Sequence, residues 1–419
     1  MDINEFHTEI TKRLPVIRQT GDFRHDLRKA LEEYAECVRQ LDPACFPDEK
    51  TKTTVLEKIE RFTGKIVAVV DLYYDGRRAD ALCMFREQMD CPDELWNSIG
   101  IHTVKEKSGD APAYWFRARL FDDKREHTFR EMFHIPLNRR EIVKTQRYSA
   151  PGYPCLYLGN TVYSCWEEMH RPHFDDLMFS GFRVRTDFDL YDLRIPKREE
   201  FDTACLEKTL VRLPLIVACM MKVKDTDAPF KPEYIVPQLL IETIICKNRE
   251  RWVRNMGPCE MTWGVIYTST HISSDFPFGA DLLENIALPV IESDGKMDYC
   301  QILASLFDIS DPFCYEYEAL KENDIKLYWE NIGEDLRPAD KIQEQYKQSK
   351  MGYLESRIEK LGRFQVLPHL VIDIPKEGIV IPQDGSPVPV KIRASGPRKI
   401  IDPETIKDPG ELPDRFVLE

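Results

Sequence analysis

The sequence predicts a mixed α/β (α+β) protein with an additional helical region on its N-terminal side. Residues 1–105 show the apolar spacing of amphipathic helices. Residues 110–365 alternate short extended runs with helical runs, and residues 368–419 carry nine prolines among short alternating segments. We therefore expect a helical N-terminal region, a central α/β domain and a Pro-rich tail.

The N-terminal region reads as a set of short antiparallel helices. The stretch "DFRHDLRKALEEYAECVRQL" has apolar side chains at helical spacing, namely Phe23, Leu27, Leu31, Tyr34 and Val38. No group of reactive side chains gathers in this region. We expect a docking or lid module that supplies no catalytic residue.

The central region contains three predicted strands and two predicted helices. The strands are "AYWFRARLF", "LYLG" and "GVIYTST", and the helices cover residues 161–170 and 237–254. Pro237 suits the first turn of the second helix, where a missing N–H costs nothing. In the tail, Asp384-Gly385 predicts a β-hairpin turn.

Composition limits the function classes. The net charge of −14 argues against general nucleic-acid binding, although it permits a small anion held by a few arginines. The 12 cysteines include no C-x-x-C pair, which is typical of free thiols in a reducing cytoplasm. The apolar run 213–221 is too short to span a membrane, and the charged N-terminus is unlike a secretory leader. We expect a cytoplasmic protein without a membrane segment.

The helix at 161–170 presents two adjacent glutamates. At 100° per residue, Val162 and Cys165 lie on the buried side of this helix, and Glu167 points to the opposite side, towards solvent. Glu168 lies at the border of the buried side, where a carboxylate can reach into a cleft. We therefore prefer Glu168 as a functional residue, with two solvated glutamates as the alternative.

Arginines and hydroxyl groups supply further candidates. Arg117 and Arg119 alternate along one strand and share a face, and Arg147 precedes Tyr148. Arginine forks suit phosphate oxygens, although surface ion pairs are the more ordinary use of such residues. Ser269 ends the strand "GVIYTST" on the same face as Tyr267.

Several well-known nucleotide-binding, catalytic and metal-binding motifs are absent from the sequence. No two glycines lie within six residues of each other, which excludes both G-x-G-x-x-G and the P-loop. There is no G-x-S-x-G and no H-E-x-x-H. His170 and His173 have no third ligand signal, so we expect no metal site.

Four ordered blocks resemble the RES domain family: "FRAR", "RYSAPGYPCLYLGNTVYSCWEE", "EYIVPQLLIETI" and "GVIYTSTH". The resemblance covers residues 110–310 well and extends loosely to 365. Small RES proteins are toxins of toxin–antitoxin pairs that destroy NAD, by hydrolysis or phosphorolysis of the nicotinamide–ribose bond. The resemblance implies a fold like that of ADP-ribosyltransferases, NAD as the substrate, no metal, and an antitoxin or regulatory protein as a partner.

The resemblance also assigns residues. It implies catalytic roles for Glu168, Arg117, Tyr157 and Ser269, and it places Arg147, Arg119, Tyr148 and Tyr267 at the bound NAD. Arg119 is close enough to Arg117 to compete for its role. The small toxins have no counterpart of the helical N-terminal region or the Pro-rich tail.

Two alternative functions stay open. The same NAD-binding residues would serve an ADP-ribosyltransferase that modifies a protein or a nucleic acid. A catalytically inactive RES-like interaction protein, whose helical region does the binding, is the other. The complete set of Arg117, Tyr157, Glu168 and Ser269 argues against the inactive form.

Overall fold

The computed structural model describes the chain in several ranges, which are residues 1–90, 99–109, 111–120, 128–202, 204–253, 261–271, 280–291, 298–314, 346–347, 349–362 and 364–365. The expected hairpin at Asp384-Gly385 lies outside these residues. Within them, no helix is long and apolar enough to cross a membrane.

Four helices make up residues 1–90, as the apolar spacing predicts: α1 (Ile3–Arg13), α2 (Phe23–Arg39), α3 (Glu49–Tyr74) and α4 (Arg78–Asp90). The carboxylates of Asp2, Asp22 and Asp48 accept first-turn N–H groups and so fix where the first three helices begin. Helix α3 has 26 residues and is longer than the expected short helices.

The expected helical range 1–105 ends in a strand. Ile101–Val104 forms β1, which pairs antiparallel with β7 (Phe188–Leu193). The central sheet therefore begins before residue 105. A run of four residues is too short to reveal its period, which is why the sequence did not separate it from the helical region.

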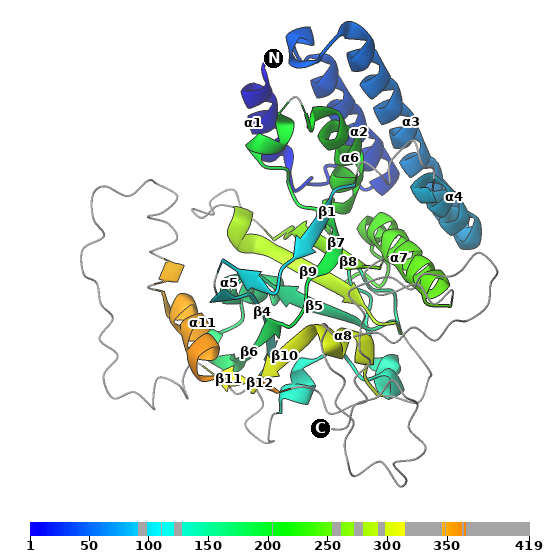
Figure 1. Cartoon of the computed structure of the whole chain (residues 1–419). Helices are drawn as coiled ribbons and strands as arrows, with labels where there is room; N and C mark the ends of the chain where they lie inside the picture. Colours follow the sequence, from blue (N-terminus) through cyan, green and yellow to red (C-terminus); the bar gives the residue numbers. More distant parts are fainter. Residues whose placement is uncertain are drawn as a thin grey trace, which may run out of the picture.

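Ten of the described strands form one large mixed sheet beneath the N-terminal helices (Figure 1). The remaining strands are β2 (Lys107–Ser108), β3 (Ala111–Pro112), β4 (Tyr114–Leu120), β5 (Cys155–Gly159), β6 (Leu177–Val184), β8 (Thr262–Thr268), β9 (Glu284–Pro289), β10 (Phe307–Ser310), β11 (Phe313–Cys314) and β12 (Phe364–Gln365). The order is β1-β7-β8-β9-β5-β4-β6-β10-β12, with β11 on β6 and a separate β2–β3 pair. Strands β7 and β8 are parallel, and the other described pairs are antiparallel.

The described helices of the central region are α5 (Val162–Glu168), α6 (Leu206–Cys219), α7 (Ile235–Val253), α8 (Gln301–Leu306) and α11 (Lys350–Leu361). Helices α5 and α7 and strands β4, β5 and β8 confirm the predicted elements, and Pro237 lies in the first turn of α7. The mixed α/β fold class is confirmed. Helix α6 accommodates Pro214 in its interior.

One face of the sheet carries two groups of helices. Over β7, β8 and β9, α6 and α7 continue the core of α1–α4, which reaches Val265 and Tyr267. Over β4 and β6, α5 and α11 pack on Phe116 and Phe179. The other face is covered by a separate core that includes Leu156 and α8. The N-terminal helices thus share a hydrophobic core with the sheet.

Helix α11 is joined to the start of α5 by a partly buried carboxyl group. Glu355 Oε1 accepts the Val162 N–H and the Tyr346 hydroxyl, each at 2.5 Å. Burial raises the pKa of Glu355 to about 7, against the opposing effect of these two hydrogen bonds. The folded state therefore keeps this proton at pH values where the unfolded chain has lost it.

The first prediction concerns stability against pH. The stabilising effect of the Glu355 proton is full below about pH 4.5 and is lost as the pH rises through about 7. Because Gln cannot ionise, the parent should lose about 1–3 kcal/mol relative to Glu355→Gln between pH 5 and 8. Urea unfolding at both pH values measures this, with Glu57→Gln on the exposed side of α3 as the control. An identical pH response in parent and Glu355→Gln would contradict it.

Candidate functional site

A cavity of about 990 Å³ lies beside α5, where β4 and β5 stop pairing. These two neighbours pair only at Phe116 and Gly159, whereas β4 pairs along its length with β6 and β5 pairs with β9. Arg117 and Tyr157, close to this single pair, line the cavity. Helix α5, the end of β8, and the segment between α6 and α7 complete its walls. Its volume suits a small-molecule ligand.

Glu168, the last residue of α5, points into this cavity and is held by neutral donors. Its Oε1 accepts the Ser269 hydroxyl at 2.6 Å and the Asn285 side-chain amide at 2.7 Å. Its Oε2 lies 3.8 Å from Nε2 of His271, and the side chain is 33% exposed. The carboxylate is thus fixed in place by one oxygen while the other faces the cavity.

The structure contradicts the expectation for Glu167. This side chain is only 4% exposed; it accepts the Tyr163 hydroxyl and forms an ion pair with Arg171 at 2.8 Å. Glu167 would be solvated only if the side of α5 away from β4 faced solvent. Instead, the chain turns sharply after α5 and lays Arg171 and its neighbours against that side.

Helix α5 ends in a Schellman motif with a histidine where glycine is usual. The N–H groups of Arg171 and His170 bond to the carbonyls of Trp166 and Glu167, each at 3.0 Å. His170 and Arg171 have φ values of 63° and 54°, a region that L-residues seldom occupy. Such strain beside a cavity is a feature of functional sites.

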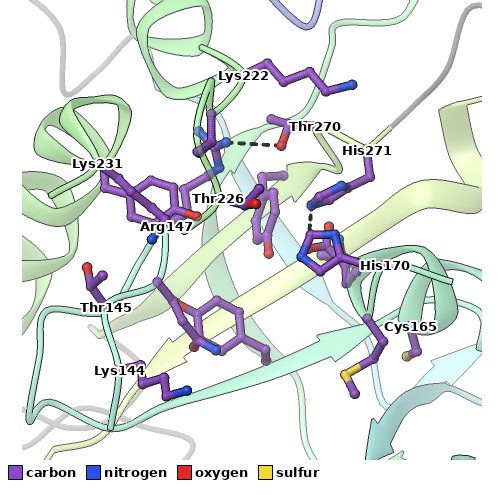
Figure 2. Close-up of a pocket in the computed structure, with 18 of the residues that line it drawn as sticks. Lys144, Thr145, Arg147, Cys165, His170, Lys222, Thr226, Lys231, Thr270 and His271 are labelled. Atoms are coloured by element: carbon purple, nitrogen blue, oxygen red, sulfur yellow. Dashed lines mark hydrogen bonds and ion pairs between the residues drawn. The ribbon is translucent and has the colours of Figure 1, made fainter. Parts of the chain in front are cut away.

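Two histidines from different segments meet at the carboxylate end of the cavity. The rings of His170 and His271 are 4.9 Å apart and nearly perpendicular (Figure 2). Burial lowers the pKa of His271, and Glu168 opposes this effect. The imidazole of His271 is therefore neutral at pH 7 and can accept a proton. Among the described residues, no three His, Cys, Asp or Glu side chains gather as a metal site.

The predicted arginines take different positions. Arg117 and Arg119 share a face, as predicted, and both donate to the Phe133 carbonyl, at 2.8 and 3.0 Å. Arg117 lines the cavity and Arg119 does not. Burial, followed by the nearby Arg119 charge, holds the pKa of Arg117 well below its usual range. An anion in the cavity would relieve this desolvated charge.

Arg147 also lines the cavity (Figure 2). It donates to the carbonyls of Cys219 and Met221 at the end of α6, and to the Thr270 hydroxyl at 3.1 Å. Its guanidinium also lies over the ring of Tyr234, 5.3 Å from the centroid. Within the described part of the chain, neither Arg117 nor Arg147 forms an ion pair with a carboxylate.

The remaining predicted residues divide between the wall and its support. Tyr157 and Tyr267 line the cavity, and burial raises the pKa of both phenols, so they remain protonated. The walls do not include Tyr148 or Ser269. Tyr148 packs 4.7 Å from the ring of Tyr267 and donates its N–H to the Tyr157 hydroxyl, while Ser269 supports Glu168.

Sequence reasoning missed Asn285 and Gly159. Asn285 bonds Glu168 through its amide nitrogen and accepts the Ser164 hydroxyl through its oxygen. A polar residue at the start of the run "NIALPV", directly before its apolar residues, was the available signal. A Cβ on Gly159 would lie 2.0 Å from Ser164 Oγ, so only glycine lets α5 approach β5 this closely.

The second prediction tests this close approach. Gly159→Ala should lower the free energy of unfolding by about 1–3 kcal/mol, because Ser164 and then Asn285 must shift. Gly64→Ala, inside α3 with nothing within 4 Å of the added methyl, should instead raise it by about 0.5–1 kcal/mol. Chemical denaturation of both variants measures the difference. Equal stability of the two variants would contradict the close packing of α5 on β5.

Comparisons with known proteins identify the family of the chain. No family model and no solved structure matches the chain. A protein of Bacillus subtilis (strain 168) named Putative toxin YopC is 31% identical to it over 319 residues, which cover 72% of this chain and 68% of that protein. The 319 aligned residues outnumber those from the start of β1 to the end of β12, which include the sheet and the helices between its strands. The chain therefore belongs to the family of the Bacillus subtilis protein named Putative toxin YopC.

Proposed function

We propose that this protein is an enzyme that consumes NAD⁺ by breaking the bond between nicotinamide and ribose, and that it acts as a toxin. The observation that carries the proposal is the Glu168 carboxylate, fixed by Ser269 and Asn285 and directed into a cavity lined by arginines without carboxylate partners among the described residues. The RES resemblance supports NAD as the substrate. The relative named Putative toxin YopC supports the toxin role.

The chemistry requires a fixed negative charge. As the bond from ribose C1 to nicotinamide breaks, its electron pair leaves with the ring nitrogen, and positive charge develops on the ribose. The Glu168 carboxylate stabilises that charge, and its Oε2 can accept a ribose hydroxyl. Nicotinamide departs as a neutral molecule and needs no proton.

The cavity also has the charge that a dinucleotide requires. Its described walls carry five basic residues against two carboxylates, Glu168 and Asp227, in a chain whose net charge is −14; the basic residues are Arg117, Lys144, Arg147, Lys222 and Lys231. Such a local excess favours the pyrophosphate group of NAD⁺. Tyr157 and Tyr267 provide flat apolar surface for a ring.

His271 is the group best placed to activate the attacking molecule. Its Nε2 lies 3.8 Å from Glu168 Oε2, which leaves room for an oxygen that bonds to both. In hydrolysis, the water oxygen bonds to ribose C1 while His271 takes the proton of that water. In phosphorolysis, a phosphate oxygen forms the new bond in place of water.

The decisive assay incubates the purified protein with NAD⁺, with and without phosphate, and follows free nicotinamide. Release of ADP-ribose indicates hydrolysis, and a phosphorylated ADP-ribose indicates phosphorolysis. If the NAD⁺ carries a label in its ADP-ribose part, transfer of that label to a protein or nucleic acid would support the ADP-ribosyltransferase alternative. No release of nicotinamide under any of these conditions would overturn the proposal and favour the inactive interaction protein.

The third prediction concerns the two neighbouring glutamates. Glu168→Gln keeps the side-chain shape but removes the charge, so kcat should fall about 100- to 1000-fold while NAD⁺ binding changes much less. Steady-state kinetics and calorimetric binding separate the two effects. Glu167→Gln is the matched control. It alters an ion pair that lies away from the cavity and whose carboxylate is buried while its Arg171 partner is half-exposed. It should therefore lower stability while kcat stays within about 3-fold of the parent. The reverse pattern would refute the role of Glu168.

The fourth prediction concerns pH. The groups facing His271 are Glu168, which raises its pKa, and His170, Arg147 and Lys222, which lower it together with burial. As a base, His271 must be neutral, so kcat should stay level through neutral pH and fall only below the usual histidine range of about 6.5. His271→Gln should reduce kcat about 100-fold and lose the acid midpoint of the parent. Retention of both the parent rate and the parent midpoint would exclude this base.

A further inference from the structure

The segment Lys222–Tyr234 joins α6 to α7 and forms one wall of the cavity. It contributes lining residues along most of its length: Lys222, Val223, Thr226, Asp227, Ala228, Pro229, Lys231 and Tyr234. Its only regular structure is the short 3₁₀ turn Pro232–Tyr234. Because so little of this segment is helix or strand, its position depends on its contacts with neighbouring elements.

A buried ion pair from the N-terminal region holds this segment. Arg18, between α1 and α2, donates from Nη1 to Glu233 Oε1 at 2.6 Å, with side-chain exposures of 7% and 2%. Arg18 Nε also lies 3.5 Å from the buried carboxylate of Asp26. The same Glu233 oxygen accepts the N–H of Lys224 at 3.2 Å. The Arg18 guanidinium thus joins Asp26 of α2 to Glu233, whose carboxylate in turn bonds the main chain at Lys224.

Three further contacts join the same two parts. The N–H of Lys222 bonds to the Val16 carbonyl at 2.8 Å, and the Lys224 ammonium bonds to the Thr20 carbonyl at 3.0 Å. Phe230 stacks on Tyr73 at the end of α3, with 6.3 Å between ring centroids and 8° between ring planes. The N-terminal helices therefore fix the wall at several points.

The ion pair between Arg18 and Glu233 is linked through Tyr234 to Arg147, which lines the cavity. Tyr234 directly follows Glu233, and its ring lies beneath the Arg147 guanidinium. A shift of Glu233 would therefore move Tyr234, and with it the support of Arg147. Lys231, which lines the cavity on the Arg147 side (Figure 2), belongs to the same segment.

We propose that Arg18 is a positioning residue for ligand binding: through Glu233 it sets the position of the wall 222–234, so that the N-terminal helical region forms part of the substrate-binding apparatus. The expected effect of Arg18 on NAD⁺ cleavage rests on the proposed function, whereas its expected effect on the position of the wall does not. This assigns the helical region a role in the cavity that its sequence did not indicate.

The fifth prediction tests Arg18 in the full-length protein. In Arg18→Met, amide hydrogen exchange within 222–234 should accelerate about 10-fold or more, because the segment loses its buried anchor. The KM for NAD⁺ should rise about 5- to 20-fold with kcat within about 3-fold of the parent, and Arg18→Lys should restore part of both. Arg13→Met is the matched control, since Arg13 is 41% exposed and, among the described residues, forms ion pairs with Glu9 of α1 and Glu33 of α2. It should behave as the parent does.

The outcomes are separable. Unchanged exchange in a folded Arg18→Met variant overturns the inference, and so does faster exchange without a change in KM. If Arg18→Met fails to fold, Glu233→Gln, which keeps the shape of the partner, is judged by the same criteria. A parent protein that does not cleave NAD⁺ overturns the proposed function, and the exchange rates alone then decide the inference about the wall.

Discussion

The arrangement of the cavity depends on the hydrogen bonds that Ser269 and Asn285 donate to Glu168. Helix α5 has seven residues and could not be stable alone. It is fixed by tertiary contacts: Thr161 and Glu355 bind its first N–H groups, and a Schellman motif closes its end. The two donors come from the residue that follows β8 and from β9, more than 100 positions away in the chain. Because both are neutral, the carboxylate is immobilised without being neutralised, as electrostatic catalysis requires.

A similar separation of position and charge applies to the arginines. Arg117 and Arg147 are held by main-chain carbonyls, which orient a guanidinium without cancelling its charge. Elsewhere in the chain, arginines such as Arg194 and Arg183 pair with carboxylates. An acidic protein can therefore present a basic cavity, because what an anionic ligand experiences is the local arrangement of charges.

The helical N-terminal region and the sheet are one packing unit on this face of the protein. The core that begins with α1 continues through α6 and α7 to β8 and β9, which carry Tyr267 and Asn285 (Figure 1). Buried charges at Arg18 and Glu233 lie along the same boundary. A buried ion pair is weak evidence for stability, because desolvation of the two charges offsets their attraction. The role that we propose for this pair is instead to set the geometry of the cavity wall.

The sequence by itself determined the fold class, the N-terminal helices, strands β4, β5 and β8, helices α5 and α7, and the shared face of Arg117 and Arg119, because these follow from the local periods of apolar residues. Strand β6 was not predicted, because nearly all its residues are buried and it therefore lacks the alternation of buried and exposed residues that marks a strand. The burial of Glu167, the support of Glu168 by Asn285, and the link from Arg18 to Glu233 were decided only by the tertiary structure. Each of these contacts joins a residue to a partner that the fold of the chain brings close. The period of a helix or strand could not predict them, because it describes only the element that contains the residue.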